Sequence, residues 1–234
     1  MNFFEKRIML VVAHPDDEIL GLGATMNKII FEEFAKIHVV ILGEGITSRS
    51  ENRDVDMWSA QLSEHRSNIE AARKCIGFES VSIYNFPDNR FDTIALLDLI
   101  KVIEKEKIKF KPDIIFTHHG GDLNIDHQKT FDAVMTSFRP LKDENVKAII
   151  TFETPSGTEW RASSDPKHFT PNLYIKVNNE HIKAKISAME CYKYERRTYP
   201  HPRSPKALEI KAQQVGITIG SEFAESFCVI RAVI

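Results

Sequence analysis

The sequence predicts an α/β protein with a doubly wound, mostly parallel sheet, and three observations support this fold class. First, short apolar stretches alternate with amphipathic stretches over the first 150 residues, which is the pattern of successive βαβ units. Second, the apolar stretches are continuous and rich in β-branched residues, which is typical of strands buried on both faces. Third, polar clusters follow the first and fourth stretches, where ligands bind in such sheets.

Strands and helices are expected to alternate through the first 153 residues. The expected strands cover residues 7–13, 37–42, 80–84, 113–117 and 146–152. The expected helices cover residues 17–35, 60–76, 93–109 and 126–138. Gly77 and Pro112 mark two of the helix ends. If the strands follow the common order 3-2-1-4-5, the first and fourth are neighbours where the strand order reverses.

The pattern changes after residue 153. A long irregular stretch lasts to Pro171 and precedes a strand expected over residues 173–177. A helix is expected over residues 180–197 and a last strand over residues 226–234, while Pro205 suits the first turn of another helix. We interpret residues 154–234 as a cap packed on a core of residues 1–153. The chain of 234 residues is therefore expected to be a single domain.

Composition excludes some function classes. Lysine plus arginine is 31 and aspartate plus glutamate is 33, which gives a formal net charge of −2. This balance offers no argument for binding nucleic acid or an anionic membrane surface. No apolar run reaches membrane-spanning length, and the run after the first few residues is too short for the core of a signal peptide. A cytoplasmic protein without a membrane span is expected, and a homo-oligomer is compatible with the sequence.

The first polar cluster is His14-Pro15-Asp16-Asp17-Glu18, directly after the first strand. Crowded, buried carboxylates lose hydration and raise one another's pKa. A metal ion relieves that cost, because it neutralises the acids and binds deprotonated imidazole and carboxylate groups. The cluster therefore predicts a metal site at the end of the first strand, although Asp16 or Asp17 alone could be a helix N-cap. Glu18 suits the helix start or a position behind the ligands.

The second polar cluster runs from His118 to His127, after the fourth strand. A catalytic zinc site has three protein ligands and an open position for water, and our choice of ligands is His14, Asp17 and His127. Asp16 would then be free to take a proton from the metal-bound water. Asp126 could orient a histidine ligand from behind.

These motifs resemble those of a known family. Ala13-His14-Pro15-Asp16-Asp17-Glu18 is similar to the signature of the PIG-L/LmbE-like zinc-dependent deacetylases, and residues 121–127 look like the second family motif. Residues 153–160 and 200–204 look like those of bacterial members linked to surface-sugar biosynthesis. The resemblance implies a Rossmann-like fold, zinc on the three ligands above, Asp16 as general base, and hydrolysis of the N-acetyl group of an amino sugar.

The chain departs from the family pattern at Asn124, where many members carry a histidine that stabilises the oxyanion or protonates the leaving amine. An amide can donate a hydrogen bond to an oxyanion but cannot donate a proton at neutral pH. His119 and His201 are the candidates for the acid, and Asp16 could also return the proton that it took. We favour His201, which lies between two prolines and beside Arg203; the alternative is a histidine that only packs in a rigid loop.

Several residues near the predicted active face are candidates for substrate binding. Trp160 could stack on a sugar ring, although a purely structural tryptophan fits equally well. Arg66 or Arg203 could bind a phosphate if the sugar is nucleotide-linked. The polar stretch of residues 47–56 is either an active-site loop or a solvated connection. The substrate candidates are Arg66, Asp88, Asn89, Arg90, Glu159, Trp160 and Arg203.

Three other functions compete with deacetylation. A nucleotide-binding Rossmann module is disfavoured, because no third glycine follows Gly21 and Gly23 at the dinucleotide spacing and the acids occupy the phosphate-binding turn. A phosphoacceptor domain needs an aspartate where the fourth strand ends in His118-His119. A metal-dependent amidase or phosphoesterase would share fold and ligands, so neither separates it from a deacetylase.

Overall fold

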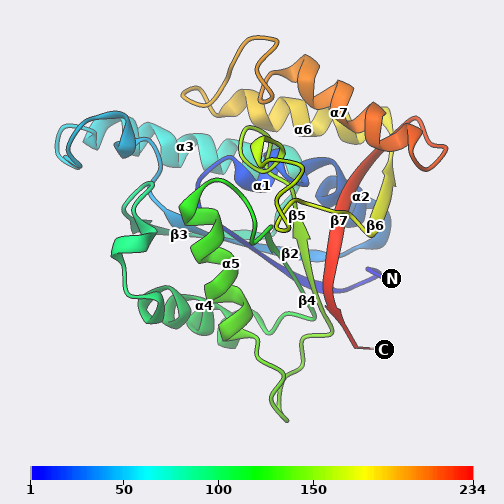
Figure 1. The fold of residues 1–234 in the computed structure, drawn as a ribbon, viewed down its shortest axis with the longest axis horizontal. Coiled ribbons are helices and arrows are strands. Elements are labelled where there is room, and N and C mark those ends of the chain that lie inside the picture. The colour runs from blue at the N-terminus through cyan, green and yellow to red at the C-terminus, as the bar shows by residue number, and fades with distance from the viewer. Residues whose placement is uncertain (1, 234) are drawn as a thin grey trace.

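The computed structural model describes residues 2–233, in which one sheet has the strand order β3-β2-β1-β4-β5-β7-β6 (Figure 1). The strands are β1 (Arg7–Val12), β2 (Lys36–Gly43), β3 (Ser80–Phe86), β4 (Ile114–His118), β5 (Ala148–Phe152), β6 (Leu173–Val177) and β7 (Phe223–Ala232). The first five strands are parallel. The predicted α/β class and the predicted order 3-2-1-4-5 of these strands are confirmed.

Helices cover both faces of the sheet (Figure 1). The helices are α1 (Asp17–Leu20), α2 (Gly23–Glu33), α3 (Ser59–Ile76), α4 (Leu96–Phe110), α5 (Ile125–Ser137), α6 (Asn179–Cys191) and α7 (Pro205–Ile217). Short 3-10 turns lie at Thr47–Arg49, Phe91–Thr93 and Thr158–Trp160. Side chains of α4 and α5 belong to one hydrophobic core, and those of α1, α2, α3, α6 and α7 belong to a second core on the opposite face.

Strand β1 explains why the first apolar stretch is continuous. Its side chains alternate between the two cores: Ile8 and Leu10 point into one, and Met9 and Val11 into the other. All four are fully buried. A strand covered on both faces needs apolar residues at every position, because its period of two assigns successive side chains to opposite cores.

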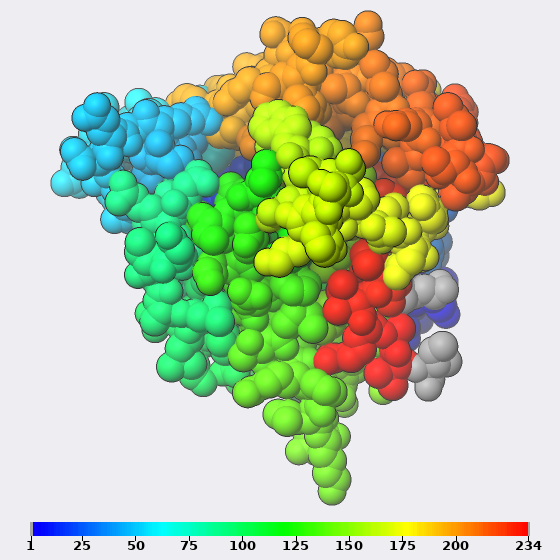
Figure 2. Space-filling view, in the orientation of Figure 1, coloured from blue at the N-terminus to red at the C-terminus, as the bar shows by residue number. Residues whose placement is uncertain are grey.

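The C-terminal part of the chain does more than cap the core. Strand β7 pairs antiparallel with β5, and β6 pairs antiparallel with β7, so residues after 153 extend the sheet by two strands. Strand β7 begins at Phe223, three residues before the predicted start, and the predicted last residue, Ile234, lies outside the described residues. Pro205 occupies the first turn of α7, as expected. Figure 2 shows the orange segment of α7 lying across the top of the molecule, beside the yellow segment that follows β5.

Three predicted helices have different bounds in the structure. The helix predicted over residues 17–35 is broken at Gly21 and Leu22; a Cβ atom at Gly21 would lie 2.2 Å from a ring atom of Phe152, so the chain approaches the sheet closely here. The helix predicted from residue 93 starts at Leu96, and α6 ends at Cys191 instead of continuing to residue 197. Among residues 2–233, no helix is both long and apolar enough to cross a membrane.

Candidate active site

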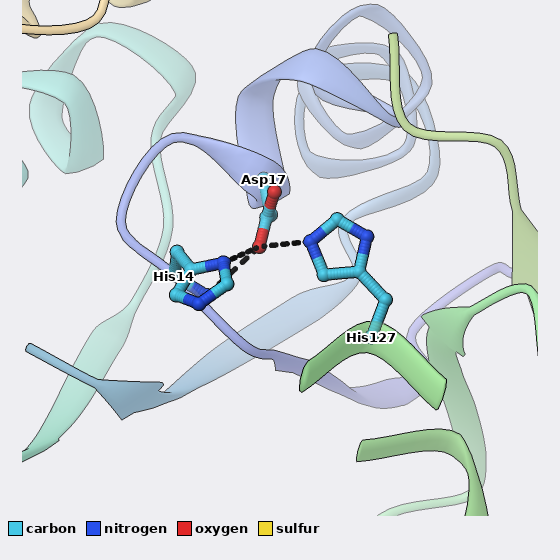
Figure 3. Close-up of side chains that lie close together, drawn as sticks. All are labelled: His14, Asp17 and His127. Carbon is cyan, nitrogen blue, oxygen red and sulfur yellow. Dashed lines mark hydrogen bonds and ion pairs between the residues drawn. The ribbon is translucent and has the colours of Figure 1, made fainter. Parts of the chain in front are cut away.

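The three predicted metal ligands lie together at the carboxyl edge of the sheet. His14 follows β1, Asp17 begins α1, and His127 lies in the first turn of α5. Figure 3 shows the Asp17 carboxylate between the two imidazole rings. Its Oδ2 atom is 3.5 Å from His14 Nδ1 and 3.4 Å from His127 Nε2. Because β1 and β4 are neighbours, the turn after β1 and the helix after β4 converge at this point.

The donor set suits a divalent cation such as zinc. The nearest nitrogen atoms of the two histidines and the carboxylate oxygen all lie within 4.8 Å of one another. Tetrahedral zinc with bonds of about 2.0 Å places neighbouring ligand atoms about 3.3 Å apart. The separations of 3.4 and 3.5 Å are close to that value. Two imidazole nitrogens and one carboxylate oxygen are also the ligands of known catalytic zinc sites.

A second carboxylate lies behind each histidine. Asp126 Oδ2 is 2.8 Å from His14 Nε2, and Asp122 Oδ2 is 3.3 Å from His127 Nδ1. Asp126 itself accepts the backbone N–H groups of Asn89 and Phe91, at 2.7 and 2.8 Å. Carboxylates in this position set the tautomer and the orientation of a metal-binding imidazole. Asp126 therefore lies where the sequence placed a histidine-orienting acid, whereas nothing in the sequence distinguished Asp122 from its neighbours.

The buried carboxylates of the cluster favour a positive charge between them. Burial opposes the charged imidazole of His127, yet Asp17 and Asp122 raise the pKa of His127 to about 9. Burial would raise the pKa of Asp17, but His127 and His118 hold it well below its usual value. A divalent cation can take over the charge that the protonated imidazole supplies, and its binding then releases that proton.

His118 belongs to the predicted second cluster, but both of its ring nitrogens already have hydrogen-bond partners. Its Nε2 accepts the Ala13 backbone N–H at 3.0 Å and lies 3.3 Å from Asp17 Oδ2, while Nδ1 lies 3.1 Å from the Thr154 hydroxyl. The ring stacks on that of His127, with centroids 3.9 Å apart. Burial and the neighbouring His127 lower the pKa of His118 to about 4. The ring is therefore neutral at pH 7 and supports His127 without offering a free nitrogen.

Asp16 lies beside the cluster and is held by an arginine. Its Oδ2 atom is 3.0 Å from Arg203 Nη1, and the same nitrogen is 2.9 Å from Glu195 Oε2. Arg203 Nε donates to the Ser156 hydroxyl at 2.7 Å. Burial raises the pKa of Asp16, and Arg203 opposes that shift. Arg203 comes from the loop before α7, so the C-terminal part of the chain supplies the counter-charge of the predicted base.

A cavity of about 300 Å³ opens over these residues. Its walls bring together most of the predicted site residues with several that the sequence did not single out. The predicted ones are His14, Asp16, Asp88, Asn89, Asn124, Trp160, His201 and Arg203. The unpredicted charged or hydroxyl-bearing ones are Ser48, Arg49, Ser156, Glu195 and Arg197. The stretch of residues 47–56 thus contributes to the site through its first residues.

The predicted Asp17, Asp126 and His127 do not line this cavity, and neither do four candidates for substrate binding or for the acid. Arg66 lines a neighbouring cavity of about 150 Å³ and donates to Asn85 at 3.3 Å. Arg90 is exposed at the end of the loop after β3. Glu159 accepts the backbone N–H groups of Ser156 and Gly157. His119 bonds to the Lys167 carbonyl at 2.7 Å. The sequence placed these candidates near the predicted active face but could not give the direction of their side chains.

Asn124 and His201 face the cavity with limited hydrogen-bonding capacity. The side-chain oxygen of Asn124 caps α5 by accepting the Asp126 N–H at 2.8 Å, and its Nδ2 donates to Asn89 Oδ1 at 3.0 Å. One amide hydrogen of Asn124 is left for a ligand. His201 Nδ1 accepts the backbone N–H of Arg203 at 3.2 Å, so its proton is on Nε2 in the neutral ring. Burial, Arg203 and Arg197 lower the pKa of His201.

By its fold and its residue cluster, the chain is a Rossmann-like α/β protein with a His–Asp–His cluster where the strand order reverses. The sequence model of the PIG-L family, described as GlcNAc-PI de-N-acetylase, matches residues 9–138. This match covers more than half of the chain and includes His14, Asp17 and His127. The chain therefore belongs to the PIG-L family.

The chain is also similar to other proteins, in sequence or in fold. The chain is 28% identical over 193 residues to the uncharacterized deacetylase YaiS of Escherichia coli strain K12, which covers 80% of this chain and 91% of that protein. N,N'-diacetylchitobiose deacetylase from Pyrococcus horikoshii superposes with a TM-score of 0.75 at 17% identity, covering 97% of this chain and 84% of that one. GalB, the 4-carboxy-2-hydroxymuconate hydratase of Pseudomonas putida, also gives 0.75 at 17% identity, covering 98% of both chains.

Proposed function

We propose that the protein is a zinc-dependent N-deacetylase that hydrolyses the N-acetyl group of an amino sugar. The observation that carries the proposal is the His14–Asp17–His127 cluster next to a polar cavity that His14 and Asp16 line. Membership of the PIG-L family supports the reaction class. The sugar and its carrier, whether nucleotide, lipid or none, are left to the substrate panel described below.

His14, Asp17 and His127 would hold the zinc ion. When bound in such a site, zinc lowers the pKa of a water molecule and polarises a carbonyl oxygen. Asp16 would accept the proton of the attacking water, because its carboxylate is buried in the cavity wall beside the ligands. Burial raises the pKa of Asp16, and the contact with Arg203 opposes that rise and fixes the position of the carboxylate.

Two side chains that line the cavity would donate hydrogen bonds to the reacting amide. They are Asn124, through its remaining amide hydrogen, and His201, through Nε2–H. The lowered pKa of His201 makes it a hydrogen-bond donor more than a proton donor at pH 7. Asp16 would therefore return its proton to the nitrogen as the carbon–nitrogen bond breaks. The hydroxyl of water ends on the acetate, and the products are acetate and the free amine.

The charge of the cavity suits a neutral polar group such as a sugar. The arginines that line it, Arg49, Arg197 and Arg203, are matched by Asp16, Asp88 and Glu195. Arg203 is already occupied by two carboxylates, which removes the reason for assigning it to a phosphate. Trp160 is 56% exposed on the cavity wall, where its ring can stack on a sugar.

Metal analysis and acetate release test the proposal together. Purified protein should hold about one zinc ion per chain, the stoichiometry of a three-ligand site. His14→Ala, Asp17→Ala and His127→Ala should each lose the metal, whereas the exposed His168→Ala is the matched control and should keep it. Acetate release is measured over free, nucleotide-linked and lipid-linked N-acetyl amino sugars. Undiminished zinc in the three variants, or a zinc-loaded enzyme that hydrolyses none of these substrates, would contradict the proposal.

The rival functions fit less well. The arginines of the cavity, Arg49, Arg197 and Arg203, all pair with Glu195, so a pyrophosphate would have to compete with that carboxylate for them. The fold does not decide between deacetylase and hydratase, because GalB shares it. The family match carries that distinction. An amidase or phosphoesterase on another small molecule would bind the same zinc and fail the sugar panel.

A further inference from the structure

The structure assigns a role to two buried residues that do not line the cavity: we propose that Glu18 and Tyr192 are positioning residues for Asp16. They hold its backbone in a left-handed conformation, and this conformation directs its carboxylate into the cavity. The inference rests on the proposed function only in treating Asp16 as the base. The backbone arrangement itself can be tested without any turnover.

Asp16 has an uncommon backbone conformation. Its φ is 107° and its ψ is −26°, a region that non-glycine residues rarely adopt. Such a conformation persists only where the surrounding structure determines it, and it occurs often at functional sites. The residue is also fully enclosed, with 2% of its surface exposed. Something in the structure must therefore hold the Asp16 backbone in place.

The contacts of the Asp16 backbone show what holds it. Its N–H donates to Glu18 Oε2 at 3.0 Å, and its carbonyl accepts the N–H groups of Ile19 and Leu20 at 3.0 and 2.9 Å. The first bond depends on a side chain, whereas the other two belong to the start of α1. The Glu18 side chain therefore supports this turn, because a residue without a side-chain acceptor at position 18 would leave the Asp16 N–H buried without a partner.

Glu18 is in turn held by Tyr192, whose hydroxyl donates to Glu18 Oε1. Glu18 is 2% exposed and Tyr192 is fully buried. A buried carboxylate is costly unless hydrogen bonds satisfy it, and these two residues use its two oxygens for one backbone amide and one hydroxyl. Neither oxygen contacts the proposed ligands or lines the cavity. Glu18 and Tyr192 therefore support Asp16 from the side away from the cavity.

Tyr192 is the first residue after α6, and its place explains why that helix stops early. Its φ of −81° and ψ of 76° take the chain out of the helix, and its ring enters the hydrophobic core beside α1. The C-terminal part of the chain therefore contributes to holding both the backbone and the carboxylate of Asp16. Tyr192 acts on the backbone through Glu18, and Arg203 binds the carboxylate.

The test compares Tyr192→Phe with Tyr84→Phe in the zinc-loaded protein. Each variant removes one hydroxyl that donates to a glutamate, but Tyr84 binds Glu106 and lies against the other core. Tyr192→Phe should lower kcat about 10-fold, because small misplacements of a reacting group cost factors of that order. KM should change less than about twofold and zinc content should stay at one per chain. Tyr84→Phe should leave kcat unchanged.

Exchange of the Asp16 amide hydrogen, followed by NMR, reports on the turn directly. In Tyr192→Phe and Glu18→Ala this amide should exchange at least about 10-fold faster than in the wild type, as expected for a lost buried hydrogen bond. The amide of Ile115 in β4 should be unaffected. Glu18→Gln keeps an acceptor for the Asp16 N–H and should restore most of kcat and of the protection.

The outcomes separate the two proposals. Failure of the wild type to hydrolyse any N-acetyl sugar would overturn the proposed function, while the exchange measurement would still decide the role of Glu18 and Tyr192. Wild-type protection of the Asp16 amide in Tyr192→Phe would overturn the positioning role. Loss of kcat together with loss of zinc would overturn it as well. If Glu18→Ala does not fold, Tyr192→Phe alone decides, because it keeps the buried ring.

Discussion

At the scale of single residues, each proposed histidine ligand turns one ring nitrogen toward Asp17 and the other toward a second carboxylate. The motifs predicted which residues would meet, because they lie at the ends of neighbouring strands. They could not predict Asp122, Glu195 or Tyr192 as partners. Those contacts depend on side-chain directions and on loops that join distant parts of the chain, and neither is encoded in local spacing.

Asp16 gives the first prediction at this scale. Asp16→Asn should keep zinc and lower kcat about 100-fold or more, because general base catalysis contributes factors of 10²–10⁴. The amide keeps the size of the side chain and tolerates the left-handed backbone, so the fold should be unchanged. Zinc analysis and acetate release are measured on Asp16→Asn beside Asp132→Asn, an exposed aspartate on α5. Near-normal turnover of Asp16→Asn would remove its role as base.

At the scale of elements, the periodicity of the apolar residues predicted the strands better than it predicted the helix ends. Buried parallel strands leave a continuous apolar signal, and the order follows a common topology. The helix predicted over residues 17–35 is interrupted at Gly21 and Leu22, and Phe152 of β5 packs closely against Gly21. Such a contact joins residues far apart in sequence, so no local pattern contains it.

One buried ion pair joins three elements and gives the second prediction. Lys185 Nζ of α6 lies 2.6 Å from Glu225 Oε1 of β7, and Glu225 Oε2 accepts the Thr25 N–H of α2 at 2.7 Å. Lys185→Met should lower the free energy of unfolding by about 3 kcal/mol, because it leaves a buried carboxylate without its partner. Urea denaturation measures this. Lys193→Met breaks an exposed pair with Glu64 and should cost under about 1 kcal/mol; equal losses in both variants would contradict the prediction.

His38 links β2 to α4 and gives a third prediction, on pH. Burial lowers the pKa of His38 below 6.5, more than Glu106 raises it. The unfolded chain therefore binds this proton more tightly than the folded chain does, so the free energy of unfolding falls as the pH drops below about 6.5. Between pH 7 and pH 5 the wild type should lose more stability than His38→Gln, measured by urea denaturation at each pH. Equal losses of unfolding free energy in the two proteins would show that His38 does not contribute to the pH dependence.

At the scale of the whole molecule, the C-terminal part is a component of the sheet, and this leads to a fourth prediction. A fragment of residues 1–153 should not fold, because β5 would become an edge strand whose five residues are all buried in the full chain. The opposite core would also lose α6 and α7. Circular dichroism and thermal denaturation compare the fragment with the full chain. A cooperative transition in the fragment would show that the first 153 residues are an independent domain.

Strand β6 pairs with the sheet only through β7 in the part of the chain that is described. During synthesis the chain leaves the ribosome from its N-terminus, so residues 14, 17 and 127 emerge well before Tyr192, Arg203 and β7. The nascent chain therefore carries every proposed zinc ligand while Tyr192 and Arg203 are still unmade. Because residues 1–153 are not expected to fold by themselves, the ligands and the supports of Asp16 are expected to come together only when the last strand has joined the sheet.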